Sequence, residues 1–219
     1  KEVAILPKET FMNLSPDKQE KVMRSAIKEF TKNGFDQGNI GDIAKSAGVA
    51  KGSMYQYFEN KRELFLYAVR WTLEVMMNKY APDMSIKNEE KDIFEFLIEN
   101  SKSSLKQIRA ERDLGIFIQN VFLGKYHNLT DESMEYMIKY SQDYMIKLIE
   151  VGQRNGSVRK DIDTNLIFLF TLGATFKLKE YMMNKARDQG EDILDADYDI
   201  YEKDIRDLIE LLKNGMGGR

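Results

Sequence analysis

Hydrogen-bonding, small and aromatic residues follow one another closely between Lys51 and Lys61. The stretch reads Lys-Gly-Ser-Met-Tyr-Gln-Tyr-Phe-Glu-Asn-Lys and contains neither histidine nor cysteine. Lysine, serine, glutamine and tyrosine side chains donate hydrogen bonds, and the phosphates and base edges of nucleic acids accept them. The residue types therefore favour recognition of a nucleic acid over acid–base or nucleophilic chemistry.

Placed on an α-helix, the first eight of these residues separate into two faces. Met54 and Phe58 are four residues apart and so point the same way, toward a core. The opposite arc holds small or hydrogen-bonding residues with a tyrosine at each border: Gly52, Ser53, Tyr55, Gln56 and Tyr57. Such a helix suits the major groove of double-stranded DNA, with base edges under its tip and phosphates on both sides. The alternative, a solvated helix with two half-buried tyrosines, leaves the surrounding pattern unexplained.

The side-chain chemistry suggests a role for each position. We expect Ser53 and Gln56 to reach base edges, and Lys51 to donate to guanine or to a phosphate. Gly52 removes a side chain, so the backbone near the helix start can approach DNA closely. Lys61 adds a cation at the start of the next helix, where backbone amides already attract a phosphate.

Two short helices joined by a turn with glycine must hold this segment in place. Asn39 is expected to cap a helix over residues 40–47, and Gly48 is expected to end it. The helix over residues 51–58 follows directly. Two short helices with this spacing predict a helix-turn-helix.

Helical patterns also account for the rest of the chain. One helix is expected between the cap Ser15 and Gly34, and a long one from Lys61 toward Tyr80, with Pro82 ending it. Five more are expected at about 88–108, 110–123, 131–154, 163–188 and 197–213. The sequence therefore predicts an all-α protein with three short helices, one long connecting helix and a bundle.

The segment from Ile40 to Phe65, IGDIAKSAGVAKGSMYQYFENKRELF, resembles the DNA-binding signature of the TetR (tetracycline-repressor-like) family. The resemblance implies that matching positions of the third helix contact bases. It also implies that the tyrosines of that helix and the lysine opening the fourth helix contact phosphates. The family usually has a threonine near the start of the second helix. Here the chain has Asn39-Ile40-Gly41, so Asn39 is expected to take that phosphate contact.

The same resemblance implies how the chain is organised. Residues 1–60 would form the helix-turn-helix DNA-binding domain, and residues 61–219 a helical bundle for ligand binding and dimerisation. We expect a homodimer whose two third helices enter successive major grooves of a pseudo-palindromic operator. A small-molecule effector of unknown identity would release this repressor from the operator. An effector-independent architectural DNA-binding protein is the alternative, and a helical-bundle enzyme or lipid-binding protein is a third class.

The bundle offers candidates for both of its expected tasks. The stretch LIFLFTLGATF, Leu166 to Phe176, is apolar on all sides, so we expect it to face its own core and a second subunit. A stripe on the last helix would join it: Tyr201, Ile205, Leu208, Ile209 and Leu212. Closure of a monomer's core is the alternative. Six residues are candidates for effector binding, although ordinary core packing is the favoured alternative for each of them: Trp71, Met76, Phe117, Phe122, Met145 and Phe168.

Composition limits the remaining possibilities. The chain has 219 residues, no cysteine and one histidine, His127, so neither a disulfide nor a histidine-based catalytic dyad can be argued. We expect no enzyme activity, no cofactor and no metal. The longest uncharged run has 13 residues, too short to span a bilayer, so no membrane partner and a cytoplasmic location are expected. Net charge is −3, but residues 1–62 carry 11 Lys/Arg and 8 Asp/Glu, which suits contact with an anion.

Overall fold

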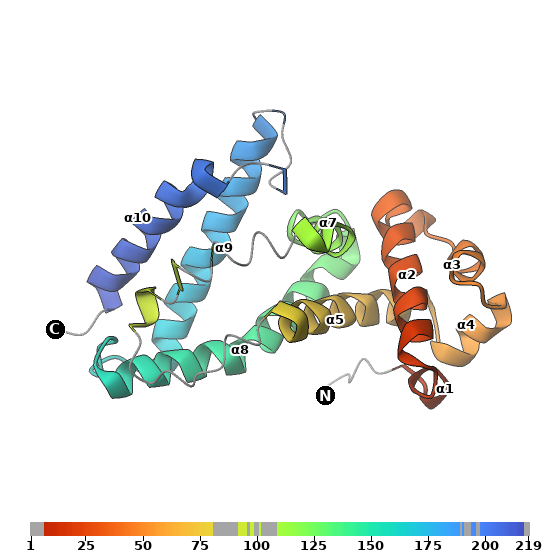
Figure 1. Cartoon of the computed structure of the whole chain (residues 1–219), viewed down its shortest axis with the longest axis horizontal. Coiled ribbons are helices and arrows are strands. Elements are labelled where there is room, and N and C mark those ends of the chain that lie inside the picture. The colour runs from red at the N-terminus through yellow and green to blue at the C-terminus, as the bar shows by residue number, and fades with distance from the viewer. Residues whose placement is uncertain are drawn as a thin grey trace. The chain divides into compact units, whose positions relative to one another are not determined.

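The chain folds into helices that belong to two compact units (Figure 1). Lys1–Asn78 together with Glu111–Met137 form the first unit, and Lys79–Ala110 together with Ile138–Arg219 form the second. The computed structural model describes residues 7–80, 92–95, 97–98, 101, 109–188, 190, 194–195 and 198–216, and these ranges contain no β-strand. The predicted all-α class is confirmed. None of the helices in these ranges is long and apolar enough to cross a membrane.

Five helices open the first unit. They are α1 (Glu9–Met12), α2 (Pro16–Gln37), α3 (Ile40–Ala47), α4 (Lys51–Tyr57) and α5 (Lys61–Tyr80). Helices α3 and α5 have the bounds that the sequence predicts. Gly34 interrupts α2 with φ 72° and ψ 178°, where the sequence predicts the end of that helix. This φ favours glycine, and the chain then continues to Gln37 before it turns into α3.

The short helix α1 was not predicted. It places Phe11 in the core, where its ring lies 5.8 Å from that of Tyr57, 5.0 Å from that of Phe58 and 5.7 Å from that of Tyr67. These aromatic contacts pack the N-terminal segment against α4 and α5. Helix α4 is therefore supported from a side that its own sequence pattern does not reveal.

Residues far along the chain complete the core of the first unit. They come from α7 (Arg112–Phe122), the 3₁₀-helix η2 (His127–Leu129) and the start of α8 (Thr130–Asn155). The ring of Phe65 in α5 lies 5.2 Å from that of Phe30, 5.5 Å from that of Phe117 and 4.8 Å from that of Tyr126. All four side chains are buried. The helix-turn-helix thus shares one aromatic core with α7.

An ion-pair cluster joins α2 to α7 inside the same unit. Arg24 donates to Glu111 at 2.8 Å and to Asp113 at 3.0 Å. Glu111 is buried, with only 7% of its side chain exposed, so Arg24 compensates a charge that water barely reaches. A second pair, Arg62 with Glu132, joins α5 to the start of α8.

The second unit contains the rest of α8, α9 (Thr164–Asp188) and α10 (Tyr198–Met216). Helices α9 and α10 pack on each other, and Lys185 pairs with Asp204 at 2.8 Å. The apolar stripe predicted on the last helix is buried in its own chain, with Leu208 partly so: Tyr201, Ile205, Leu208, Ile209 and Leu212. The predicted helix at 88–108 falls mostly outside the described residues.

Candidate nucleic-acid interface

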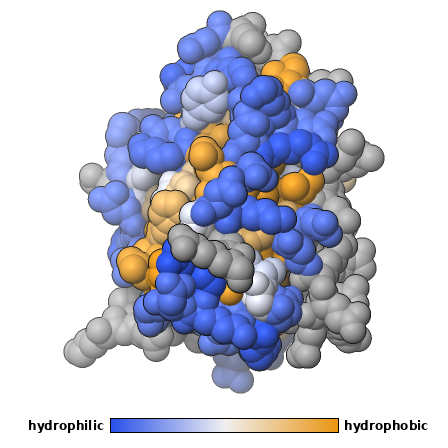
Figure 2. All heavy atoms as spheres, turned by 90° about the vertical axis from the view of Figure 1, so that its left-hand side faces the viewer, coloured by the Kyte–Doolittle hydropathy of each residue, from blue (hydrophilic) through white to orange (hydrophobic). Residues whose placement is uncertain are grey.

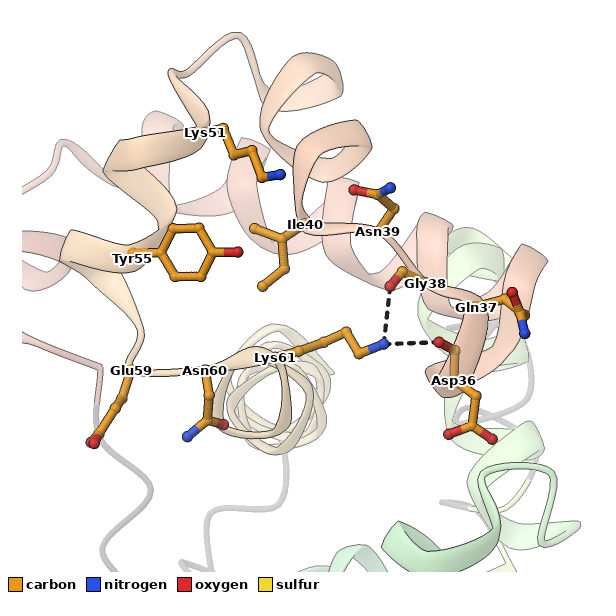
Figure 3. Close-up of a pocket in the computed structure, with 10 residues that line it drawn as sticks. All are labelled: Asp36, Gln37, Gly38, Asn39, Ile40, Lys51, Tyr55, Glu59, Asn60 and Lys61. Carbon is orange, nitrogen blue, oxygen red and sulfur yellow. Dashed lines mark hydrogen bonds between the residues drawn. The ribbon is translucent and has the colours of Figure 1, made fainter.

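A hollow of about 500 Å³ opens on the first unit where α2 ends, α3 and α5 begin and α4 passes (Figure 3). Its lining combines two lysines with amides, a tyrosine and two carboxylates: Asp36, Gln37, Gly38, Asn39, Ile40, Lys51, Tyr55, Glu59, Asn60 and Lys61. Four of the predicted DNA contacts meet here, namely Asn39, Lys51, Tyr55 and Lys61. Residues that are 22 positions apart in the sequence thus line one depression.

Helix α4 shows the two faces that its sequence predicts. Met54 and Phe58 are each 2% exposed and belong to the core. The opposite side is solvent-exposed at Lys51, Gly52 and Gln56. Ser53 is partly buried between these faces. The helix therefore presents a short polar ridge to whatever approaches the molecule.

The two tyrosines of α4 differ in their surroundings. Tyr55 is 47% exposed, and its ring lies beside the hollow (Figure 3). Tyr57 is half-buried, and its ring packs edge-on against Phe11. The predicted borders of the exposed arc are therefore unequal, because one tyrosine also supports the core.

Gly52 has no packing role within the described part of the chain. A β-carbon built at this position would meet no atom within 4 Å, and the backbone is helical. Glycine inside a helix costs roughly 0.5–1 kcal/mol relative to alanine because it is freer in the unfolded state. The folded chain alone therefore does not account for glycine at this exposed position.

Gly41, in contrast, lies close against the cap of α3. The amide of Gly41 donates to Asn39 Oδ1 at 2.7 Å, and a β-carbon on Gly41 would lie 3.0 Å from that oxygen. The backbone N–H of Asn39 in turn donates to Glu29 Oε1 at 3.0 Å. Capping occupies the side-chain oxygen of Asn39, so its NH₂ group is the part that could reach a phosphate.

Lys61 has a structural role that the sequence did not reveal. Its ammonium group donates to the carbonyl oxygens of Asp36 at 3.0 Å and Gly38 at 3.2 Å (Figure 3). The same group lies 4.8 Å from the centre of the Phe35 ring. An ammonium group has three N–H donors, so one stays available to a phosphate. At the same point Asn60 caps α5 by accepting from the Glu63 amide at 2.9 Å.

The six residues suggested for an effector site are divided between the units. Trp71, Met76, Phe117 and Phe122 belong to the first unit, and Met145 and Phe168 to the second. Phe117 is wholly buried, Phe168 is 4% exposed, and the other four are partly buried. Trp71 lies under the guanidinium of Arg24, whose central carbon is 5.8 Å from the ring centre. Their joint role in effector binding stays a prediction.

Residues 22–68 match the family described as bacterial regulatory proteins, tetR family. This span runs from within α2 into α5 and contains α3, α4 and the whole lining of the hollow.

Similarity also extends beyond that span. The chain is 24% identical over 184 residues to IcaR of Staphylococcus aureus, a negative transcriptional regulator of the biofilm operon icaADBC, covering 80% of this chain and 93% of IcaR. It is 24% identical over 144 residues to the transcriptional repressor KstR2 of Rhodococcus jostii, covering 64% of this chain and 68% of KstR2. FadR from Bacillus subtilis, solved in complex with stearoyl-CoA, has the same fold with a TM-score of 0.67 at 21% identity, covering 90% of this chain and 98% of FadR. The tetR family model thus matches the helix-turn-helix segment of the chain, and the similarity to transcriptional regulators and their fold extends over most of its length.

Proposed function

We propose that the protein is a transcriptional repressor that binds an operator as a homodimer and releases it when a small molecule binds. In this proposal α4 enters the major groove, and the residues around the hollow hold the phosphates beside it. The site of action is the cytoplasm, where operator DNA lies.

The observation that carries this proposal is the exposed ridge of α4 with glycine at its start. Gly52 faces open space, and its neighbours Lys51 and Gln56 carry donors that match base edges and phosphates. A chain that gives up helix stability at an exposed position gains from close approach of a partner to that backbone. DNA is the partner whose groove accepts a helix of this shape.

Phosphate binding follows from the charges at the hollow. Lys51 and Lys61 lie on two of its sides, and the amide group of Asn39 lies at its edge (Figure 3). Two carboxylates, Asp36 and Glu59, share the lining and discourage entry of a free anion that brings no other contact. We therefore assign the hollow to the backbone of a DNA strand that α4 already anchors.

Dimerisation is supported by apolar side chains on α9 and α10 that their own unit leaves exposed. Leu166, Leu169 and Phe170 are 59%, 60% and 54% exposed, and Leu211 is 68% exposed. The three α9 residues share one helix face with Gly173, which is exposed and meets no atom within 4 Å of a built β-carbon. Apolar side chains are visible among hydrophilic ones on the side of the molecule that Figure 2 presents. A second copy of these two helices would cover them in a four-helix interface.

Repression and effector response are supported by the relatives. IcaR is named a negative regulator and KstR2 a repressor, while FadR was solved with stearoyl-CoA. Long-chain acyl-CoA is therefore the first effector class to test. Binding at the bundle would favour a conformation that no longer fits the operator, a coupling worth typically ~1–3 kcal/mol.

Selection from a pool of random DNA duplexes tests the proposal. We expect the protein to enrich a pseudo-palindromic sequence with half-sites about 34–36 Å apart. Fluorescence anisotropy on the enriched duplex would then show whether stearoyl-CoA or another small molecule releases it. Enrichment of no sequence above background would contradict operator binding. Tight, sequence-selective binding that no effector changes would favour the effector-independent architectural protein instead.

A further inference from the structure

We infer that α1 is a positioning element for the recognition helix α4, and that Lys8 and Thr10 set how precisely α4 reads DNA. This inference rests on the proposed function. Helix α1 precedes residues 22–68, the span that matches the family, so the match does not assign it a role.

Three successive carbonyl oxygens at the end of α4 accept hydrogen bonds from the segment around α1. The Tyr55 oxygen accepts from the Lys8 ammonium at 3.0 Å, and the Tyr57 oxygen accepts from the Lys8 amide at 2.8 Å. Between them, the Gln56 oxygen accepts from the Thr10 hydroxyl. One short segment therefore satisfies the last three carbonyl oxygens of α4.

Helix α4 depends on such outside donors because of how it ends. The last carbonyls of any helix lack partners within that helix, and α4 has only seven residues. Many helices end in a glycine that turns back to bond these carbonyls. Here the C-cap is Phe58, which is extended at φ −132° and ψ 145° and returns one bond, from its amide to Met54. The Lys8 cation also opposes the negative end of the helix dipole.

The hydrogen bonds from Lys8 and Thr10 to the end of α4 form a clamp, and the segment that makes them is itself anchored to the core of the first unit. Phe11 is wholly buried against Phe58 and its neighbours, so α1 cannot lift away without opening the core. Gln19 of α2 donates to the carbonyl oxygens of Met12 and Leu14, both at 3.0 Å. Helix α1 therefore fixes the end of α4 to α2 and to the core.

The clamped backbone belongs to the residues that face DNA. Gln56 is expected to reach a base edge and Tyr55 a phosphate, so fraying of this turn would move both side chains. Attraction of the DNA backbone to Lys51 and Lys61 at the hollow would persist. Loss of the clamp should therefore lower affinity for the specific operator and leave affinity for random DNA unchanged.

Matched variants in the full chain separate this role from a direct contact. Thr10→Val removes the hydroxyl donor without changing charge, and Thr10→Ser keeps it. Lys8→Met removes the ammonium, and Lys28→Met removes the same charge from an exposed site on α2. Two quantities are measured: hydrogen exchange of the α4 amides in the free protein, and the ratio of operator affinity to random-DNA affinity over a range of salt concentrations.

One hydrogen bond corresponds to about three- to tenfold in an equilibrium. We therefore expect Thr10→Val and Lys8→Met each to speed exchange at the end of α4 by about that factor, and to lower the affinity ratio by about as much. Thr10→Ser and Lys28→Met should behave as the parent does. The salt dependence of binding should be the same for Lys8→Met and Lys28→Met.

Two results would overturn the inference. Unchanged α4 exchange in both Thr10→Val and Lys8→Met would show that α1 does not hold the helix. Equal loss of operator and random-DNA affinity in Lys8→Met, with a log–log salt slope lower by about 0.9 than in Lys28→Met, would make Lys8 a phosphate contact. A parent protein that binds no DNA selectively would defeat the proposed function itself, and the exchange data would still show whether α1 holds α4.

Discussion

The ammonium nitrogen of Lys61 lies 3.0 Å from the carbonyl oxygen of Asp36 and donates a hydrogen bond to it. The same group donates to Gly38, so the first residue of α5 closes the end of α2 across more than twenty residues of chain. Lys61 therefore stabilises the end of α2 and also supplies a positive charge to the lining of the hollow. Removing it should affect both stability and DNA binding.

Lys61→Ala should lower both stability and DNA affinity. We expect the free energy of unfolding to fall by about 1 kcal/mol, because two carbonyl oxygens lose a charged donor at a partly exposed site. The log–log salt slope of DNA binding should fall by about 0.9, one phosphate's worth. Urea titration and anisotropy at several salt concentrations measure the two effects. Lys28→Ala is the control for loss of charge. An unchanged salt slope in Lys61→Ala would mean that Lys61 stabilises the folded chain but contacts no phosphate.

Gly52→Ala should stabilise the protein and weaken DNA binding. The added methyl group meets nothing in the folded chain, so helix propensity favours the variant, by at most the roughly 0.5–1 kcal/mol that applies in the middle of a helix. The same methyl group would stand between the α4 backbone and DNA. Thermal unfolding and operator affinity should therefore change in opposite directions. Gly41→Ala is the contrasting variant, because its β-carbon would crowd Asn39 Oδ1 and lower stability.

Gln56→Ala should change which DNA sequences the protein prefers. We expect the preference at one or two base pairs to relax by about 1–3 kcal/mol each, because a bidentate base contact is lost. Repeating the duplex selection with the variant measures this directly. Gln37→Ala, on the lining of the hollow but outside α4, should keep the parental preference. An unaltered preference in Gln56→Ala would mean that α4 is oriented differently in the groove.

Leu169→Glu should break the proposed dimer. Leu169 is 60% exposed on α9, so a carboxylate there leaves the fold of one chain intact and introduces two like charges into the interface. Light scattering at micromolar concentration should show a dimer for the parent and a monomer for the variant. Lys147→Glu adds the same side chain to an exposed position of α8 and should stay dimeric. A parental monomer would refute the interface outright.

Arg24→Met should destabilise the first unit through Glu111. Burial lowers the pKa of Arg24, and hydrogen bonds to Glu20, Glu111 and Asp113 raise it by more, so the guanidinium stays charged. Without it, the buried Glu111 carboxylate loses the charged donor that lies 2.8 Å away. We expect a loss of about 1–3 kcal/mol in urea unfolding, moderated by the 30% exposure of the Arg24 side chain.

The double variant Arg24→Met/Glu111→Gln checks this explanation. It removes the buried charge along with its partner, so it should recover part of the lost stability. No recovery would mean that Arg24 acts through its packing over Trp71 rather than through the ion pair.

Local patterns predicted helices α3, α4 and α5 of the helix-turn-helix segment well. The Asn39 cap, the left-handed Gly48 and the Asn60 cap are each set by residues within a few positions of the helix end they define. The inward and outward faces of α4 follow from helical spacing alone. These features depend on short-range geometry, which a sequence displays directly.

The missed features depend on contacts between groups that lie far apart in the sequence. The side chains of Lys61 and Lys8 donate to main-chain carbonyl oxygens. Every residue has such an oxygen, so the residue types in a sequence do not indicate which carbonyl a lysine will contact. Helix α1 has four residues, too few for an apolar period. Arg24 and Glu111 are 87 positions apart, and only the fold brings them together. A single sequence does not indicate which of its many charges will pair.

The first unit is discontinuous in sequence, and this affects how the protein is made. A ribosome releases the recognition helix early, but Phe117 and Tyr126 emerge only after the intervening residues that belong to the second unit. Until then, Phe65 lacks two of the rings that bury it, and the nascent DNA-binding segment has an open core. Products of interrupted translation that end before Tyr126 should therefore be removed by proteases rather than compete with the finished repressor for its operator.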